Sequence, residues 1–593
     1  MKVIVRKPSV GYIDRWLWVP KMYVSVDPVK SALTHVLSDS YTGKERILYL
    51  WRETRDHLLV PRAFWDPMKL PFPVIDCRPQ SYPRIEFEHK IKLDHRLKKI
   101  DGVNVLQPTG SKIQQKSVQA LLGAQGGILQ LACGLGKTVI ALYKIAEGKV
   151  PALVMCDNTN LMYQWCKEVE SLLIVPGGVG VFGAGKHDWR HGLVLATYQS
   201  VANWSDTIDE EARCWFGQVF FEEGHHLSAP TFAATADMFY GNRYSLTATP
   251  ERDDGLHVIS TVHIGNVLYK DLTPTMLPSF AFYWSGLELD LRDPTVVTKV
   301  MDCNQEVSLS KVNGFFGQWT ARLNILMDIV TRSQRNGRVT LLLSNSVDEV
   351  VNLMTLFERG PSAVGNLYTD IPTPTPQELG ETLTPLDLSP RDMSRLEKKR
   401  KALEKQKIAA NSKSSDVTVI DAEITQIAQA LKQNDVFRKI QNELAKRRKK
   451  YILELIAASQ KCGLLTYDVP HKDRQRMLET KDVIFAVTKY GKEGMNCPRL
   501  DTVILSSLFS SRNGLQQLMG RPTRPMPGKK PPILLAIVDN VGQCIGMSKK
   551  LIGHLRDWPR EEGGPYEPIL IGYPGTSWTN KKNTTTLSDL LGQ

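Results

Sequence analysis

The stretch Gly126-Gly-Ile-Leu-Gln-Leu-Ala-Cys-Gly-Leu-Gly-Lys-Thr138 joins a short apolar run to a glycine-rich turn that ends in Lys-Thr. Residues 128–131 have the pattern of a buried strand, and residues 138–146 that of the helix that follows it. Gly134 and Gly136 allow the backbone N–H groups of the turn to face inward, where the positive end of the helix adds to their field. The stretch therefore predicts a cradle for phosphate groups.

Two side chains at the end of this turn suit such a cradle. The ammonium group of Lys137 is expected to reach the β and γ phosphates, and the hydroxyl of Thr138 to ligate Mg²⁺. The full phosphate-loop pattern has a glycine where Leu131 stands, so only the Gly-x-Gly-Lys-Thr half is matched. A turn with a purely structural role is the alternative.

Length and composition exclude several classes of protein. At 593 residues the chain is too long for a single core, and about three to five domains are expected. A formal charge of +13 and a pI of about 9.1 favour polyanionic partners. The nine cysteines include no Cys-x-x-Cys pair, which argues against a disulfide framework or a zinc site. Without a leader or an apolar run of about 18 residues, we expect a soluble, intracellular protein of the cytoplasm with no membrane partner.

A second apolar run, Val219-Phe-Phe-Glu-Glu-Gly-His-His226, ends in two adjacent carboxylates. In an ATPase, the first of such a pair helps to hold Mg²⁺ and the second orients or deprotonates the attacking water. Two adjacent acids in isolation are more often a solvated turn, but the preceding strand and His225 favour the catalytic role. The region that contains both runs, residues 101–275, alternates strand and helix signals and predicts a parallel sheet covered by helices.

Four motifs stand out along the sequence: Gly134-Leu-Gly-Lys-Thr138, Glu222-Glu-Gly-His225, Thr247-Ala-Thr249 and Gln517-Leu-Met-Gly-Arg-Pro-Thr-Arg524. Together they resemble motifs I, II, III and VI of superfamily 2 helicases. Because Arg252-Asp-Asp254 follows the third of them, the chain looks most similar to the group that contains the UvsW and XPB helicases and related phage enzymes. The resemblance covers roughly residues 101–550 and implies an α/β fold of two RecA-like parallel-sheet lobes, with ATP and Mg²⁺ in the cleft between them.

The resemblance implies a role for each matching residue. Lys137 and Thr138 would bind phosphate and Mg²⁺, Glu222 would help to hold the metal, and Glu223 would be the catalytic base. Gln114 lies in a segment similar to the one whose glutamine recognises adenine. The other implied residues are His225, Thr247, Thr249 and Gly494 for coupling, and Gln517, Arg521 and Arg524 for catalysis from the second lobe. Candidate nucleic-acid contacts are Thr159, Thr197, Asn345, Thr488, Lys398, Arg400, Arg447 and Arg448.

Two residues depart from the family pattern. Glu222 stands where aspartate is usual, and its extra methylene moves the carboxylate by about 1 Å, a shift that matters when a metal must be aligned for in-line attack. Asn496 stands where aspartate is common, and it can accept a hydrogen bond but brings no charge. We expect an active ATPase because the rest of the ATP site is present; slow or absent hydrolysis is the alternative.

The remaining segments complete a predicted domain order. The N-terminal module is β-rich, and its mixture of arginine and aromatic residues fits either nucleic-acid binding or a small core. The second lobe is interrupted by a proline-rich linker and two helices at 389–410 and 419–457, which suggest an antiparallel hairpin. The predicted order is an accessory module at 1–100, lobe 1 at 101–275, lobe 2 at 276–371 and 459–555, the insertion at 372–458 and a poorly ordered tail at 556–593.

The insertion is the most basic part of the chain. Residues 385–455 hold 17 Lys and Arg against 10 Asp and Glu. The runs at 398–401 and 446–450 would each neutralise several phosphates, which favours an arm that grips DNA or separates its strands. A solvated helical face and a protein-docking hairpin are the alternatives.

As a whole, the resemblance implies an ATP-driven DNA helicase or translocase that acts on duplex or branched DNA. Fork regression, branch migration and R-loop unwinding, alongside recombination or replication proteins, are the tasks that it suggests. Three other functions remain open: a hydrolysis-impaired DNA clamp or scaffold, the motor subunit of a nuclease complex, and an RNA helicase.

Overall fold

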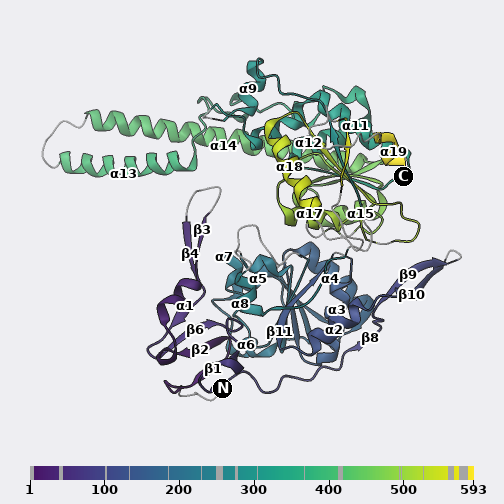
Figure 1. The fold of residues 1–593 in the computed structure, drawn as a ribbon. Coiled ribbons are helices and arrows are strands. Elements are labelled where there is room, and N and C mark those ends of the chain that lie inside the picture. The colour runs from purple at the N-terminus through teal and green to yellow at the C-terminus, as the bar shows by residue number, and fades with distance from the viewer. Residues whose placement is uncertain are drawn as a thin grey trace. The chain divides into compact units, whose positions relative to one another are not determined.

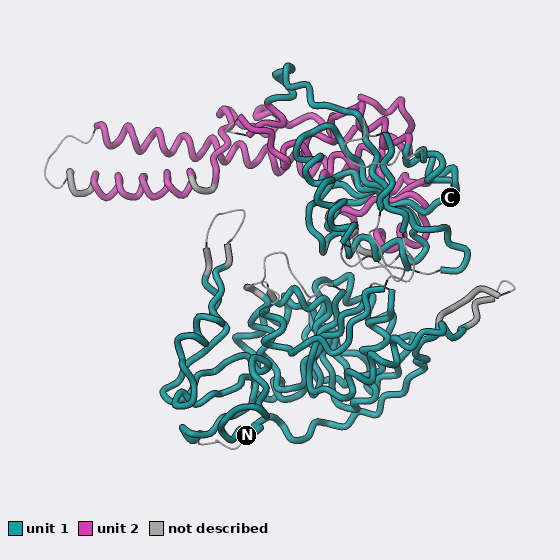
Figure 2. The backbone as a smooth tube through the Cα atoms, viewed as in Figure 1, with its two compact units in different colours: residues 1–297, 329–345, 486–593 teal, residues 298–328, 346–485 magenta. Residues whose placement is uncertain are grey.

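The structure is a computed structural model that describes most of the 593 residues. The chain forms two compact units: residues 1–297, 329–345 and 486–593 make up the first, and residues 298–328 and 346–485 the second (Figure 2). The described residues are 6–38, 45–100, 103–132, 134–183, 186–228, 230–248, 258–273, 278–302, 305–365, 367–411, 418–492, 495, 497–524, 526–557, 567–572 and 585–592.

The N-terminal region forms a small β module, as the sequence predicts. Leu17 and Val19 are paired with Val60 and Leu58 across an antiparallel pair of strands, and all four are buried. Because side chains alternate along a strand, these residues make one face of the sheet apolar. The sheet has the order β5-β6-β2-β1-β7, and its strands are β1 (Gly11–Ile13), β2 (Trp16–Pro20), β5 (Arg52–Glu53), β6 (His57–Pro61) and β7 (Val74–Asp76); α1 (Val26–Ala32) and the pair β3 (Thr34–Ser38) and β4 (Glu45–Tyr49) extend the module (Figure 1).

Several arginine and aromatic residues of this module pack inside the protein. Trp16 is 6% exposed, and its indole packs edge-on against the ring of His263, with 6.2 Å between the ring centroids. Arg62 donates hydrogen bonds of 2.7 Å to the backbone carbonyls of Tyr240 and Gly241, which lie in the adjoining sheet region. For these residues the structure favours a packing role over stacking on nucleic acid.

The adjoining region contains an eight-stranded sheet with the order β15-β14-β16-β12-β17-β18-β11-β19. The neighbours from β14 to β19 run parallel, and the edge strand β15 pairs antiparallel with β14. The strands are β11 (Gly126–Leu131), β12 (Ala152–Cys156), β14 (Val179–Gly183), β15 (Lys186–His187), β16 (Leu193–Thr197), β17 (Gln218–Glu222), β18 (Asn242–Thr247) and β19 (Val267–Asp271).

Helices cover both faces of this sheet. Along β17, Phe220 joins the core on one face, whereas Val219 and Phe221 join the core on the other. Two buried faces explain why these strands are continuous apolar runs in the sequence. The first core also contains residues of α2 (Ile113–Leu122), α3 (Lys137–Gly148) and α4 (Thr159–Leu172); the second contains residues of α5 (Tyr198–Trp204), α6 (Glu210–Trp215) and α8 (Val258–Ile264).

His263 on α8 lies buried where the N-terminal module meets this sheet region, and the indole of Trp16 packs edge-on against it. Burial, together with the charges of Arg243 and Arg62, lowers the pKa of His263 from 6.5 to about 3. Between these two values the unfolded chain binds a proton that the folded chain does not, so stability falls as the pH falls below about 6.5.

We therefore expect the thermal unfolding midpoint of the wild-type protein to fall more between about pH 7 and about pH 5 than that of a His263→Phe variant. Phenylalanine keeps an aromatic ring next to Trp16 but cannot titrate. At pH 5, about 1.5 units below the ordinary histidine pKa of 6.5, the neutral His263 lowers the free energy of unfolding by about 2 kcal/mol, because one pKa unit is worth about 1.4 kcal/mol. Equal falls in differential scanning fluorimetry would contradict a neutral, buried His263.

A second sheet has the order β22-β23-β21-β24-β25-β20-β26. Strand β21 pairs parallel with β24, β24 with β25, and β20 with both β25 and β26. The expected fold class, an α/β protein with two parallel-sheet domains and a small N-terminal β region, is thus confirmed. The strands are β20 (Ser279–Trp284), β21 (Thr340–Ser344), β22 (Cys462–Leu465), β23 (Val483–Val487), β24 (Thr502–Leu505), β25 (Ile533–Val538) and β26 (Ile569–Ile571); the longer helices of this part of the chain are α11 (Thr320–Arg335), α12 (Val347–Arg359), α15 (His471–Thr480), α17 (Arg512–Met519) and α18 (Gly542–Arg556).

The insertion is a pair of helices in the second unit, α13 (Pro390–Asn411) and α14 (Thr418–Ala458), which lie side by side (Figure 1). Their bounds agree with the predicted helices to within one residue. The proline-rich segment before them contacts α14: Glu378 forms an ion pair of 2.6 Å with Arg447, and Glu381 one of 2.5 Å with Lys439. These two ion pairs therefore hold the predicted linker against α14.

Shorter elements complete the described part of the chain. Of the described helices, none is both long enough and apolar enough to cross a membrane. The shorter elements are β8 (Glu88–His89) paired with β13 (Leu173–Ile174), β9 (His95–Ile100) paired with β10 (Val103–Pro108), and the helices α7 (Pro230–Ala233), α9 (Pro294–Val300), α10 (Leu309–Phe315), α16 (Thr488–Lys492) and α19 (Leu587–Gly592).

Candidate nucleotide-binding site

Three motifs meet at the carboxyl edge of the first sheet. The glycine-rich turn follows β11, Glu222 is the last residue of β17, and Thr247 is the last residue of β18. These three strands are parallel neighbours in the order β17-β18-β11, so their carboxyl ends lie at the same edge. Ligands of open parallel sheets bind at this edge, which makes it the candidate site.

The glycine-rich turn has the backbone conformation that a phosphate cradle requires. Gly134 and Gly136 have φ angles of 87° and 86°, in the left-handed region that residues with a side chain rarely adopt. Lys137 begins α3, and its Nζ donates a hydrogen bond of 3.2 Å to the carbonyl of Leu131. Thr138 follows in the first turn of the helix and is partly exposed. The predicted cradle residues are therefore together.

Gln114 is fixed against this turn by an aspartate that the sequence did not single out. The carboxylate of Asp94 accepts hydrogen bonds from the N–H groups of Gln114 and Gln115, at 2.9 and 3.1 Å. The Gln114 side chain accepts from the N–H of Asp94 at 2.6 Å and donates to the carbonyl of Leu135 at 3.2 Å. A Cβ added to Gly136 would lie 2.4 Å from Nε2 of Gln114, so only glycine fits there.

Glu222 is a buried carboxylate with an unsatisfied oxygen. It is 6% exposed, and within the described residues its Oε2 has no hydrogen-bond partner. Burial raises the pKa of Glu222, the negative charge of Glu223 raises it further, and Lys137 opposes both effects. Oxygen ligands suit Mg²⁺, and a divalent cation would satisfy the orphaned oxygen while stabilising the ionised form. The residues present therefore fit a magnesium ion at this edge.

Glu223 has a different environment, although it is the next residue. Burial would raise its pKa, but the charges of Lys137, His225 and other cations outweigh this effect and hold the pKa below its usual range. The hydroxyl of Thr247 donates to Oε2 of Glu223 at 3.3 Å, and Nδ1 of His225 lies 3.5 Å from the same oxygen. The structure thus brings together Glu223, His225 and Thr247, with Glu223 ionised at neutral pH.

The backbone of this carboxylate pair is held by residues that the sequence analysis missed. The hydroxyl of Tyr198 donates to the carbonyl of Glu222 at 3.0 Å, and the N–H of Glu223 donates to the carbonyl of Leu246 at 2.8 Å. The hydroxyl of Ser260 donates to the carbonyl of Gly224 at 2.7 Å. Tyr198 and Ser260 are 24 and 36 residues away from their partners, and no local pattern marks either of them.

The remaining predicted residues of the first sheet lie at helix starts. Thr159 is the first residue of α4, and its side chain is exposed. Thr197 precedes α5, and its hydroxyl accepts a hydrogen bond of 3.2 Å from the N–H of Ser200. Their contact with nucleic acid stays a prediction. Thr249 lies outside the described residues, as do Gly494, Asn496 and the segment 252–254.

The predicted residues of the second sheet follow its strands. Asn345 is exposed after β21, and Thr488, after β23, is buried. Gln517 lies on α17, with Arg521 and Arg524 beyond its end. Nη1 of Arg521 donates to the carbonyl of Met495 at 2.8 Å, and the carbonyl of Arg524 accepts from Lys529 at 2.7 Å. The predicted roles of these five residues toward nucleotide or nucleic acid stay predictions.

The four basic candidates on the insertion differ in their surroundings. Lys398 is exposed on α13, and Arg400 lies 3.5 Å from Glu404 one turn further on. On α14, Arg447 forms the ion pair with Glu378, and the guanidinium of Arg448 lies 5.0 Å from the centroid of the Tyr368 ring. Much of the predicted basic run on α14 thus contacts neighbouring groups of the same unit.

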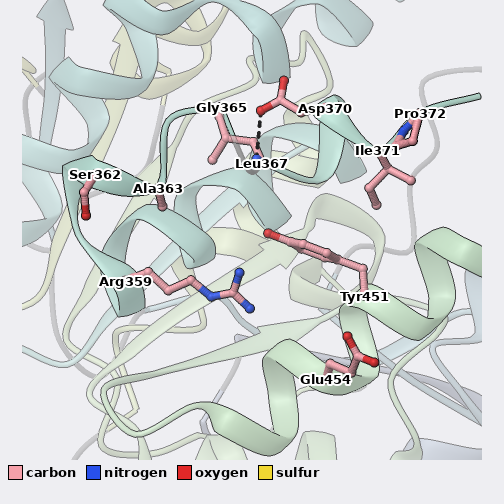
Figure 3. A pocket seen from close by; sticks show the side chains of 10 residues that line it. All are labelled: Arg359, Ser362, Ala363, Gly365, Leu367, Asp370, Ile371, Pro372, Tyr451 and Glu454. Carbon is pink, nitrogen blue, oxygen red and sulfur yellow. Dashed lines mark hydrogen bonds between the residues drawn. The ribbon is translucent and has the colours of Figure 1, made fainter.

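A cavity of about 550 Å³ lies in the second unit, between the end of α12 and the end of α14 (Figure 3). Arg359 and Tyr451 face it, and the guanidinium lies 5.5 Å from the centroid of the ring. The hydroxyl of Tyr451 is 3.0 Å from that of Thr355. None of its ten lining residues is a predicted site residue, so the cavity is not part of the candidate site.

Comparison with known proteins gives one family match over part of this chain and matches to individual proteins. Residues 107–252 match the family described as type III restriction enzyme, res subunit. The DNA 3′-5′ translocase XPB2 of Sulfurisphaera tokodaii is 34% identical over 159 residues, which are 26% of this chain and 34% of that protein. The DNA 3′-5′ helicase XPB of Kineococcus radiotolerans is 30% identical over 148 residues, which are 24% of this chain and 26% of that protein. The chain therefore spans about a third or less of the length of these relatives.

Among solved structures, Dbp5 of S. cerevisiae bound to RNA and ADP BeF3 matches with a TM-score of 0.42 and 9% sequence identity, over 76% of this chain and 88% of that chain. The family match at 107–252 includes the residues that build the cradle and the carboxylate pair. The resemblance that the motifs predicted is confirmed: this chain is similar to superfamily 2 helicases, with XPB helicases among the relatives that it matches.

Proposed function

We propose that this chain is an ATP-dependent DNA helicase or translocase. One observation carries the proposal: the turn at 134–138, the pair Glu222 and Glu223, and Thr247 meet at one sheet edge with geometry suited to a magnesium nucleotide. The similarity to the two XPB relatives, which are named as a DNA translocase and a DNA helicase, supports the same function.

The residues at this sheet edge have different roles in the proposed hydrolysis of ATP. The N–H groups of the glycine-rich turn and the ammonium group of Lys137 hold the phosphates, and Gln114 stays fixed beside the turn. Mg²⁺, bound through Thr138 and Glu222, would offset the negative charge of the phosphate oxygens. Glu223, ionised at neutral pH, accepts a proton from the attacking water, and the hydroxyl of Thr247 keeps its carboxylate in place.

The more specific parts of the proposed function, which are the substrate, the task and the roles of the second lobe, rest on the resemblance to superfamily 2 helicases. We infer that the substrate is duplex or branched DNA, with fork regression, branch migration or R-loop unwinding as the task, and that Gln517, Arg521 and Arg524 act on the nucleotide from the second lobe. Contacts with the phosphate backbone would make the motor insensitive to base sequence. The domain bounds given above, and partners among recombination or replication proteins, belong to the same proposal.

The test is DNA-stimulated ATPase activity across fork, four-way junction, single-stranded, duplex and R-loop substrates, with Lys137→Ala as the control. We expect the wild-type protein to be stimulated by DNA and the variant to fall to the background rate, because the variant loses the ammonium group that holds the phosphates.

The other functions give different results in this experiment, in the same ATPase assay with duplex RNA, or on purification of the protein. A wild-type rate equal to that of Lys137→Ala, with DNA binding retained, would replace the motor by a clamp or scaffold. Stronger stimulation by duplex RNA than by any DNA would identify an RNA helicase. Co-purification with a nuclease would identify the motor subunit of a cutting complex.

A further inference from the structure

Helix α8 contacts two parts of the first unit through adjacent residues. Ile259 is fully buried within the core of the N-terminal module, together with residues of β2 and β6. The carbonyl of Val262 accepts a hydrogen bond of 2.9 Å from the N–H of Ala63, at the end of β6. Ser260, next to Ile259, is 3% exposed and donates its hydroxyl to the carbonyl of Gly224. One short helix thus joins the module to the loop that carries Glu223.

This loop depends on its surroundings for its shape. Glu223 has a φ of 48°, in the left-handed region that costs a residue with a side chain free energy unless neighbouring contacts impose it. At Gly224, a Cβ would lie 2.1 Å from the hydroxyl oxygen of Ser245, so the backbone there is in close contact with β18. The hydrogen bond from Ser260 holds the carbonyl of Gly224, and with it the orientation of the preceding Glu223 residue.

Ser260 lies in the first turn of α8, which begins at Val258, so no carbonyl of its own helix lies one turn back for its hydroxyl to contact. A serine further along a helix commonly donates to a carbonyl of its own helix, about one turn back. Ser117, Thr355 and Ser548 do this in α2, α12 and α18. Ser260 instead reaches across to Gly224 at 2.7 Å, in a place where a buried hydroxyl without a partner would cost free energy.

We propose that Ser260 is a positioning residue for ATP hydrolysis, and that α8 transmits the placement of the N-terminal module to Glu223. The inference rests on the proposed function, because it assigns Ser260 to the reaction of that site. The carboxylate of Glu223 must be aligned with the attacking water, and a misplacement of about 1 Å can cost about 100-fold in rate. The binding of ATP depends mainly on the cradle, which Ser260 does not touch.

Steady-state ATPase kinetics test the positioning role. We expect Ser260→Ala to lower kcat for DNA-stimulated hydrolysis by about 10-fold to 100-fold, with KM for ATP within about twofold of the wild type. Ser260→Thr keeps the hydroxyl and is expected to restore most of kcat. The matched control is Ser548→Ala, which removes a buried serine hydroxyl that donates to the carbonyl of Ile545 at 2.8 Å. Equal kcat values for Ser260→Ala, Ser548→Ala and the wild type would overturn the proposal.

Amide hydrogen exchange tests the link without using activity. We expect Ser260→Ala, and also Ile259→Ala in the core of the module, to increase exchange in peptides that cover residues 220–226, and Ser548→Ala to leave it unchanged. Unchanged exchange in both α8 variants would overturn the link. If the wild-type ATPase rate equalled that of Lys137→Ala, the proposed function would fail, whereas this measurement would still decide whether α8 holds the loop.

Discussion

Replacement of Glu223 by glutamine is expected to lower the rate of ATP hydrolysis by about 1,000-fold and to leave ATP binding intact. General base catalysis contributes about 10²-fold to 10⁴-fold, and an amide of the same shape cannot accept the proton of the attacking water. Lys137 and His225 hold the pKa of the carboxyl below its usual range, so the wild-type group is ionised at neutral pH. Single-turnover hydrolysis and the binding of a fluorescent ATP analogue measure the two quantities separately.

Glu222→Asp is the matched comparison for this variant. It keeps the charge but moves the neighbouring carboxylate by about 1 Å, a shift that can cost about 100-fold in rate, so we expect its turnover to stay within about 100-fold of the wild type. A Glu223→Gln rate as high as that of Glu222→Asp would show that Glu223 is not the base. Loss of analogue binding in Glu223→Gln would mean instead that the substitution damages the cradle.

Arg521→Ala is expected to lower the DNA-stimulated ATPase rate by about 1,000-fold or more. An arginine that stabilises the charge on the transferring phosphoryl group is worth about 10³-fold to 10⁵-fold in kcat. Arg521→Lys should recover little of this, because an ammonium group cannot reproduce the planar, forked contact of a guanidinium. In the structure Arg521 donates to the carbonyl of Met495, the residue that follows the predicted coupling residue Gly494 in the sequence.

The control for Arg521 is Arg512→Ala, which removes an exposed arginine from the start of the same helix. Its ATPase rate is expected to equal that of the wild type, and both variants should bind DNA without ATP as the wild type does. A rate for Arg521→Ala within about tenfold of the control would remove the predicted role of this arginine in hydrolysis. Reduced DNA binding by Arg521→Ala would place the residue at the nucleic acid instead.

The parallel strands and the residues of the phosphate cradle could be predicted from the amino-acid sequence. Buried parallel strands are continuous apolar runs, and a phosphate loop is built from consecutive residues, so both are visible in short windows. The helices of the insertion were predicted to within one residue for the same reason, because helical periodicity is local. The adjacent pair Glu222 and Glu223 was likewise recognisable, because a strand end and its next residue are contiguous.

The residues that hold the cradle and the carboxylate pair in place could be identified only from the folded structure. Asp94, Tyr198 and Ser260 hold Gln114, Glu222 and Gly224 from 20, 24 and 36 positions away in the chain. Such contacts depend on which strands become neighbours and on where each connecting helix packs, and a window of sequence contains neither fact. The different pKa directions of Glu222 and Glu223 have the same origin: burial raises the pKa of both carboxyls, but folding places different charged groups around each of them.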